Sequence, residues 1–140
     1  MVRIACFADD ETLLAAIHRA LHQHGVSLST LSASALSDDV RQAARGVAPD
    51  LILLELAPTL TNAHLVFFLR ADKALRSVPI ILLSHTSHLT SHAAALGADA
   101  FLRLPATREQ IADTVFNLLP SMPAREVGIA PSRIPIALPG

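Results

Sequence analysis

Three short apolar runs constrain the fold of this 140-residue chain more than any other feature of its sequence. They span residues 2–7, 51–56 and 78–83. Apart from Arg3 and Glu55 every residue in them is apolar, and apolar runs of this length are typical of strands buried on both faces of a parallel sheet. Segments with helical spacing separate them, so strand and helix alternate along the chain. The alternation predicts an α/β protein in which helices cover both faces of a parallel sheet.

Two weaker strands and five helices complete the predicted pattern. Residues 26–31 and 100–104 are the weaker strands. The first expected helix is capped by Asp9 or Asp10 and ends at Gly25, and the second spans 38–45, between Ser37 and Gly46. The third carries Leu65, Phe68 and Leu69 on its apolar face, and the fourth spans 87–96. The fifth begins at the Thr107–Gln110 capping box. Right-handed crossovers then favour a flavodoxin-like, doubly wound sheet in the order 2-1-3-4-5, with two helices on one face and three on the other.

The chain divides into residues 1–119, which carry this pattern, and a proline-rich C-terminal tail over 120–140. The tail holds five of the nine prolines and no helical periodicity. Its Ile134, Ile136 and Leu138 alternate, so an extended tail would present all three on one side. We expect the tail to pack on its own domain or on a second copy, which makes a homodimer the expected assembly.

The composition excludes several classes of function. Charged residues make up only 16% of the chain, against about 25% in an average soluble domain, so we expect part of the surface to be covered. A net charge of -1 gives no electrostatic reason to expect nucleic acid. No apolar run approaches the roughly 20 residues that span a membrane, and no signal peptide is recognisable. Cys6 is the only cysteine and should be a buried thiol, so we expect a cytoplasmic protein.

Three carboxylates follow strands whose carboxyl ends should meet at one edge of the sheet. Asp9 and Asp10 follow the first strand, and Glu55 lies at the end of the third. In doubly wound sheets functional groups gather at this edge. Three like charges in a small space need a divalent cation, or at least one of their pKa values rises. A Mg²⁺ site is therefore one expectation, and helix capping by the two aspartates is the other.

The layout of these residues resembles the receiver domain of bacterial two-component response regulators. The likeness rests on Asp9-Asp10, on Glu55 after an apolar strand, and on Gly97-Ala98-Asp99-Ala100-Phe101-Leu102-Arg103-Leu104-Pro105. It implies Mg²⁺ binding by Asp9, Asp10, the residue at position 55 and the backbone carbonyl of Ala57. It also implies that Ser84 contacts a phosphoryl group, that Phe101 is a switch aromatic, and that Pro105 follows a cis peptide bond.

Two departures from the family pattern bear on function. The family's phosphoryl-accepting aspartate is Glu55 here, and its lysine is Leu104. A carboxylate displaced by about 1 Å loses alignment for phosphoryl transfer, and leucine supplies no cation. Arg103 should point to the opposite face of its strand, so it does not replace the lysine. Pro58 also comes one residue earlier than in the family. We expect no stable phosphorylation, and Glu55 as a mimic of the phosphorylated state remains an alternative to an inactive site.

The leading hypothesis is a degenerate receiver that acts by binding a protein, either a sensor kinase or a downstream effector, without enzymatic activity. The alternatives are a working phosphoryl-accepting receiver and a flavodoxin-like domain that binds a small ligand. The pairs His18/His22 and His88/His92 have a spacing that zinc can use, but two ligands are too few. Nucleotide-binding and hydrolase motifs are absent from the sequence.

Overall fold

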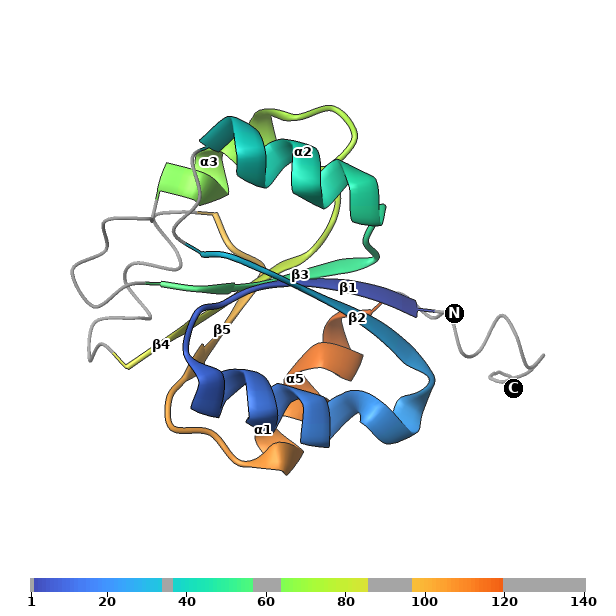
Figure 1. Ribbon diagram of the computed structural model, residues 1–140, viewed down its shortest axis with the longest axis vertical. Coiled ribbons are helices and arrows are strands. Elements are labelled where there is room, and N and C mark those ends of the chain that lie inside the picture. The colour runs from blue at the N-terminus through green and yellow to red at the C-terminus, as the bar shows by residue number, and fades with distance from the viewer. Residues whose placement is uncertain (1, 34–36, 57–63, 86–96, 120–140) are drawn as a thin grey trace, which may run out of the picture.

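The computed structural model describes residues 2–33, 37–56, 64–85 and 97–119. Five strands form one parallel sheet in the order β2-β1-β3-β4-β5 (Figure 1). They are β1 (Val2–Phe7), β2 (Val26–Leu31), β3 (Leu51–Glu55), β4 (Ile80–Ser84) and β5 (Ala100–Arg103). The predicted flavodoxin-like sheet and its strand order are confirmed.

The burial of each strand follows from its place in the sheet. β1, β3 and β4 are central, and all five residues of β4 are buried. Residues 4–7, 51–54 and 80–83 within them are all apolar and buried, because helices cover both faces. β2 and β5 lie at the two edges, and each of their residues is either exposed or of intermediate exposure. The edge position explains why these two strands have the weaker apolar pattern.

The described helices form two layers, one on each face of the sheet (Figure 1). Helices α1 (Glu11–Leu21) and α5 (Arg108–Leu118) pack together on one face. Helices α2 (Ser37–Val47) and α3 (His64–Ala71) cover the other. A short 3₁₀ turn, η1 (His22–His24), extends α1. The placement of α1 and α5 together on one face agrees with the prediction of two helices on one face and three on the other. The helix predicted over 87–96 lies outside the described residues.

Several predicted helix ends are confirmed by their hydrogen bonds. Asp10 caps α1, and the Thr107 side chain accepts from the Gln110 backbone while the Gln110 side chain accepts from that of Thr107. Gly25 follows η1 with a left-handed φ of 67°, which glycine adopts without steric cost. These local bonds satisfy N–H groups that have no partner inside a helix. They therefore fix where α1 and α5 start.

Three details differ from the sequence prediction. Helix α2 continues through Gly46 to Val47, and Ala48 takes the left-handed conformation with a φ of 52°. The Ala48 N–H bonds the carbonyl oxygen of Ala44, so this residue rather than Gly46 ends the helix. On α3 the buried face carries Leu65, Val66 and Leu69, while Phe68 is 38% exposed. Finally, β4 begins at Ile80, because the Val78 N–H is used in a turn with Leu75.

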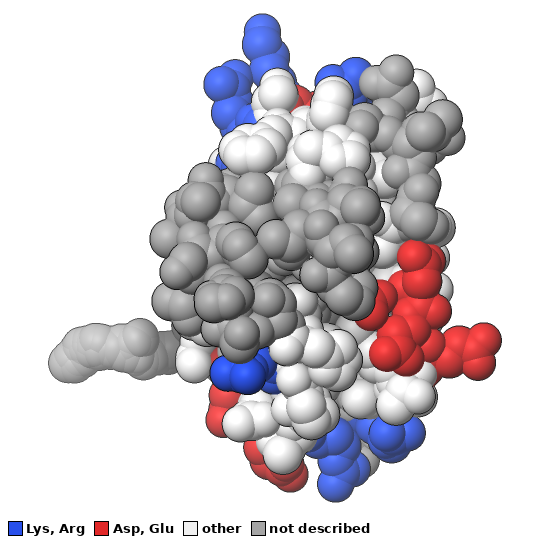
Figure 2. All heavy atoms as spheres, turned by 90° about the vertical axis from the view of Figure 1, so that its left-hand side faces the viewer, with Lys and Arg blue, Asp and Glu red and all other residues white. Residues whose placement is uncertain are grey.

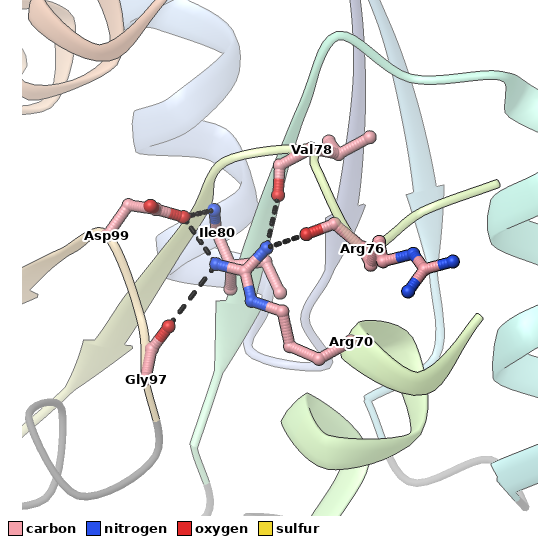
Figure 3. Close-up of polar contacts among 6 residues, drawn as sticks. All are labelled: Arg70, Arg76, Val78, Ile80, Gly97 and Asp99. Atoms are coloured by element: carbon pink, nitrogen blue, oxygen red, sulfur yellow. Dashed lines mark hydrogen bonds and ion pairs between the residues drawn. The ribbon is translucent and has the colours of Figure 1, made fainter. Parts of the chain in front are cut away.

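Arg70 on α3 ties this helix to the sheet edge at which β4 and β5 begin (Figure 3). Its guanidinium donates to the carbonyl oxygens of Arg76, Val78 and Gly97 and to the carboxylate of Asp99. The same Asp99 oxygen accepts from the Ile80 N–H at 2.8 Å. One side chain thus joins α3 to the turns that lead into β4 and β5, at the edge opposite the carboxylates.

A second ion pair joins α2 to the turn after α3. The Asp72 side chain is fully buried, and its Oδ2 lies 2.5 Å from the Arg45 guanidinium and 3.8 Å from that of Arg41. Its Oδ1 accepts from the Ala74 N–H at 2.8 Å. The hydrogen bond from Arg45 holds the pKa of Asp72 below its ordinary value.

No helix among the described residues is long and apolar enough to cross a membrane.

Candidate functional site

The carboxyl ends of the central strands bring the three predicted carboxylates to one edge of the sheet. β1 and β3 are parallel neighbours, with Phe7 in register with Leu54. Asp9 and Asp10 follow β1 by two and three residues, and Glu55 is the last residue of β3. Figure 2 views this edge and shows a compact group of acidic side chains on it. The parallel pairing of β1 with β3 is therefore enough to bring the three carboxylates to one edge of the sheet.

Glu55 is turned onto the backbone of the loop between β1 and α1. Its Oε1 accepts from the N–H of Asp9 at 2.9 Å and from that of Asp10 at 3.3 Å. Glu55 is half-buried, whereas both aspartates are exposed. The prediction that Glu55 faces the two aspartates is confirmed. What the sequence did not show is that the carboxylate binds their backbone amides.

The two aspartate side chains also accept backbone hydrogen bonds. Asp10 Oδ1 accepts from the N–H of Thr12 at 2.9 Å and of Leu13 at 3.4 Å, which caps α1. Asp9 Oδ1 accepts from the Ala33 N–H at 3.3 Å, so it ties the loop after β1 to the loop after β2. The capping alternative for Asp10 is therefore correct, and Asp9, Asp10 and Glu55 each help to hold the backbone.

This arrangement does not fit the implied magnesium site. Among the described residues, no three His, Cys, Asp or Glu side chains are grouped so that they could hold one metal ion. As described, the Asp9, Asp10 and Glu55 side chains are not grouped around one point, and the Mg²⁺ site itself stays a prediction. The physical reason is that the longer glutamate reaches the loop amides, so Oε1 points to N–H donors instead of a shared metal. Ala57, the fourth proposed ligand, lies outside the described residues.

Ser84 and Leu104 lie at the same edge of the sheet as the three carboxylates. Ser84 ends β4 and is 1% exposed, and its carbonyl oxygen accepts from the Leu104 N–H at 2.8 Å. Leu104 is 6% exposed and belongs to the core between the sheet and helices α1 and α5. The Leu104–Pro105 peptide bond is cis, as the resemblance implies. The lysine position is thus occupied by an apolar side chain that packs in the core.

The remaining β5 positions agree with the alternation of a strand. Arg103 is exposed and Leu104 buried, so the arginine lies on the opposite face and does not supply a cation beside Leu104. Phe101, the expected switch aromatic, is 41% exposed on this edge strand. The structure places it outward, and its role as a switch remains a prediction.

A pocket of about 100 Å³ opens beside the carboxylates. Asp10, Leu13 and Ala16 line it from the start of α1, His85 from the end of β4, and Leu104 and Pro105 from the end of β5. Most of these side chains are apolar, with Asp10 and His85 as polar members. Sequence reasoning missed the pocket, because its walls come from three separate segments and Leu13 and Ala16 had not been singled out.

Cys6 lies fully buried in β1 below this edge. Burial, and secondarily the Glu55 charge, raise the pKa of its thiol to about 12. A thiol with this pKa stays protonated and unreactive at neutral pH. The predicted structural role of Cys6 is therefore confirmed. His18 lies on α1 and His22 is the first residue of η1, and both line one surface pocket. The second predicted pair, His88 and His92, falls outside the described residues.

No protein-family model matches the chain, and no curated protein matches it. Solved structures do. Vibrio cholerae chemotaxis protein CheY4 superposes with a TM-score of 0.71 at 19% identity, covering 85% of this chain and 99% of CheY4. The receiver domain of sensor histidine kinase PA1611 from Pseudomonas aeruginosa, with a magnesium ion coordinated in its active site cleft, gives 0.70 at 20% identity, covering 84% and 97%.

A third match is the signal receiver domain of a histidine kinase from Syntrophus aciditrophicus. It has a TM-score of 0.71 at 22% identity and covers 99% of this chain and all of that domain. The strand order, the cis peptide before Pro105 and these superpositions agree. The chain has the fold of the response regulator receiver domain.

Proposed function

We propose that the chain is a receiver-like signalling domain of a two-component system that acts by binding a protein partner without being phosphorylated. One observation carries the proposal. The residue at the phosphoryl-accepting position, Glu55, uses its carboxylate to bind the amides of Asp9 and Asp10. The partner would be a sensor kinase or a downstream effector, and the domain itself would have no enzymatic activity.

Phosphoryl transfer places demands on this edge that its residues do not meet. The attacking oxygen must lie in line with the donor, and cations must neutralise the charge that develops on the phosphoryl oxygens. Oε1 of Glu55 is held by two N–H groups, and Leu104 provides no charge. Each defect removes either alignment or electrostatic stabilisation.

A working receiver is the second candidate. Asp9, Asp10 and buried Ser84 lie at the same edge as Glu55, as this candidate requires. The magnesium ion of the Pseudomonas receiver structure also favours it by analogy of fold. Rotation of the Glu55 side chain away from the loop amides would be the first step needed. The cost is the loss of two hydrogen bonds to a charged acceptor.

Incubation with acetyl phosphate and Mg²⁺, read by intact mass, separates the two candidates. The wild-type chain should show no gain of about 80 Da, the mass of a phosphoryl group. A double variant, Glu55→Asp with Leu104→Lys, restores both missing groups and is the positive control. A wild-type gain that maps to Glu55 would overturn the proposal.

A further inference from the structure

We propose that the pocket beside Leu104 receives a lysine or arginine side chain of the protein partner, an inference that rests on the proposed function. The pocket lining is mostly apolar, with three polar members, and consists of Asp10, Thr12, Leu13, Ala16, His85, Leu104, Pro105 and Ala106. It has an apolar wall and an acidic rim. A long basic side chain combines an apolar stem with a cationic end, so it matches both.

The apolar part of the pocket has the size of such a stem. A water molecule occupies about 30 Å³ of liquid, so a pocket of about 100 Å³ holds three or four atoms of similar size. The lysine stem has four methylene groups and the arginine stem has three. Leu13, Ala16 and Leu104 offer them contact without polar groups that would lose hydrogen bonds to water.

The charge at the rim selects a cation. Asp9, Asp10 and Glu11 are exposed and consecutive. Within the described part of the chain neither Asp9 nor Asp10 forms an ion pair, and Asp10 accepts its two N–H bonds through Oδ1 alone. Its Oδ2 is left to accept from an incoming ammonium or guanidinium group. Figure 2 shows a group of acidic side chains on this side of the molecule.

The helix dipole of α1 does not reverse this preference. Its N-terminus carries about half a positive charge, which by itself would favour an anion. Three carboxylates on consecutive residues, 9–11, outweigh it several-fold. Among the described residues that line the pocket there is no Lys or Arg to pair with a phosphate or carboxylate ligand, and His85 is the one basic side chain. The balance therefore favours a cation at the mouth of the pocket.

Methyl and amide NMR of the full chain tests the inference with n-butylammonium as the probe. We expect saturable shifts at Leu13, Ala16 and Leu104 in the millimolar range, as befits a ligand of about five heavy atoms. Butyrate should produce no shifts there, and n-butanol should bind several-fold more weakly. Asp10→Asn keeps the helix cap, because asparagine caps as well as aspartate, but should weaken butylammonium about three- to tenfold. Asp113→Asn, on the exposed side of α5, is the matched control and should change nothing.

Three outcomes would overturn the inference. Equal affinity for butanol and butylammonium, or unchanged binding in Asp10→Asn, would mean an apolar pocket without preference for a cation. The absence of saturable shifts with any probe would mean that no side chain enters. A dimer that dissociates on addition of butylammonium would identify a second copy of the chain as the occupant. Phosphorylation of Glu55 would refute the proposed function through a separate measurement, so the two failures can be told apart.

Discussion

Glu55→Asp should destabilise the domain, although aspartate is the residue that receivers carry at this position. In the structure Glu55 Oε1 lies 2.9 Å from the Asp9 nitrogen and 3.3 Å from the Asp10 nitrogen. Removing one methylene shortens the side chain by about 1.5 Å. Both distances then exceed the limit of a hydrogen bond if the backbone stays in place. The loop between β1 and α1 loses the acceptor that holds it to β3.

The size of the effect follows from the two hydrogen bonds. A bond to a charged acceptor contributes about 1.5–3 kcal/mol, and the longer of these two lies toward the weak end. Glu55 is half-exposed, so water replaces part of what is lost. We expect the free energy of unfolding to fall by about 1–2 kcal/mol in total. For a domain of this size that lowers Tm by roughly 3–8 °C.

Thermal and urea unfolding in EDTA, followed by circular dichroism, measure this change. Glu55→Gln is the matched variant, because its amide oxygen can still accept from both N–H groups, and it should cost under about 1 kcal/mol. Asp50→Ala is a control at the opposite edge of the sheet, where Asp50 Oδ2 accepts from the Arg3 N–H at 2.8 Å. The wild-type Tm should be the same in EDTA and in about 10 mM Mg²⁺, because a bound ion would raise it. If Glu55→Asp is as stable as wild type in EDTA, the reasoning is refuted.

Two further predictions concern the fold around the site. The pKa of Asp72 in the folded protein is lower than its ordinary value of 3.8, so the ion pair stabilises the protein at pH values above 3.8. This stabilisation is lost as the pH falls through the lower, folded-state pKa. In acid unfolding titrations the wild type should therefore lose stability below about pH 4, and Asp72→Asn should lose less. Truncation after Leu119 should lower Tm or shift sedimentation toward monomer if the tail covers an apolar surface such as the one around exposed Phe101. Unchanged mass and Tm would make the tail a passive linker.

The sheet could be predicted from the sequence because its central strands are buried on both faces. Burial on both faces requires unbroken apolar runs, and residues 51–54 and 80–83 meet that requirement. Parallel pairing then places the strand ends at one edge, so the proximity of Asp9, Asp10 and Glu55 followed without knowledge of side-chain conformation. Helix starts were also readable, since Asp10 and Thr107 bond to backbone groups two or three residues away.

Features set by tertiary packing or by the choice of rotamer could not be read in this way. The end of α2 at Val47 reflects the conformation of Ala48, for which the sequence offered the nearby glycine as a better candidate. The exposure of Phe68 depends on how α3 lies on the sheet, and the periodicity of the helix leaves that rotation open by one position. The conformation of Glu55 is the same kind of problem, because the extended and the loop-bound carboxylate are both compatible with the sequence.

That one choice of conformation links the fold to the proposed function. An aspartate at the end of β3 is too short to reach the loop amides, so its oxygens stay available to a metal ion and a phosphoryl donor. Glutamate reaches them, and the loop then takes its N–H partners from within the chain. Leu104, in place of a cation, extends the apolar core up to the same edge and leaves the exposed carboxylates of Asp9 and Asp10 to face solvent. Such an edge no longer suits an anion, but it retains the shape and the charge with which a basic protein surface can bind.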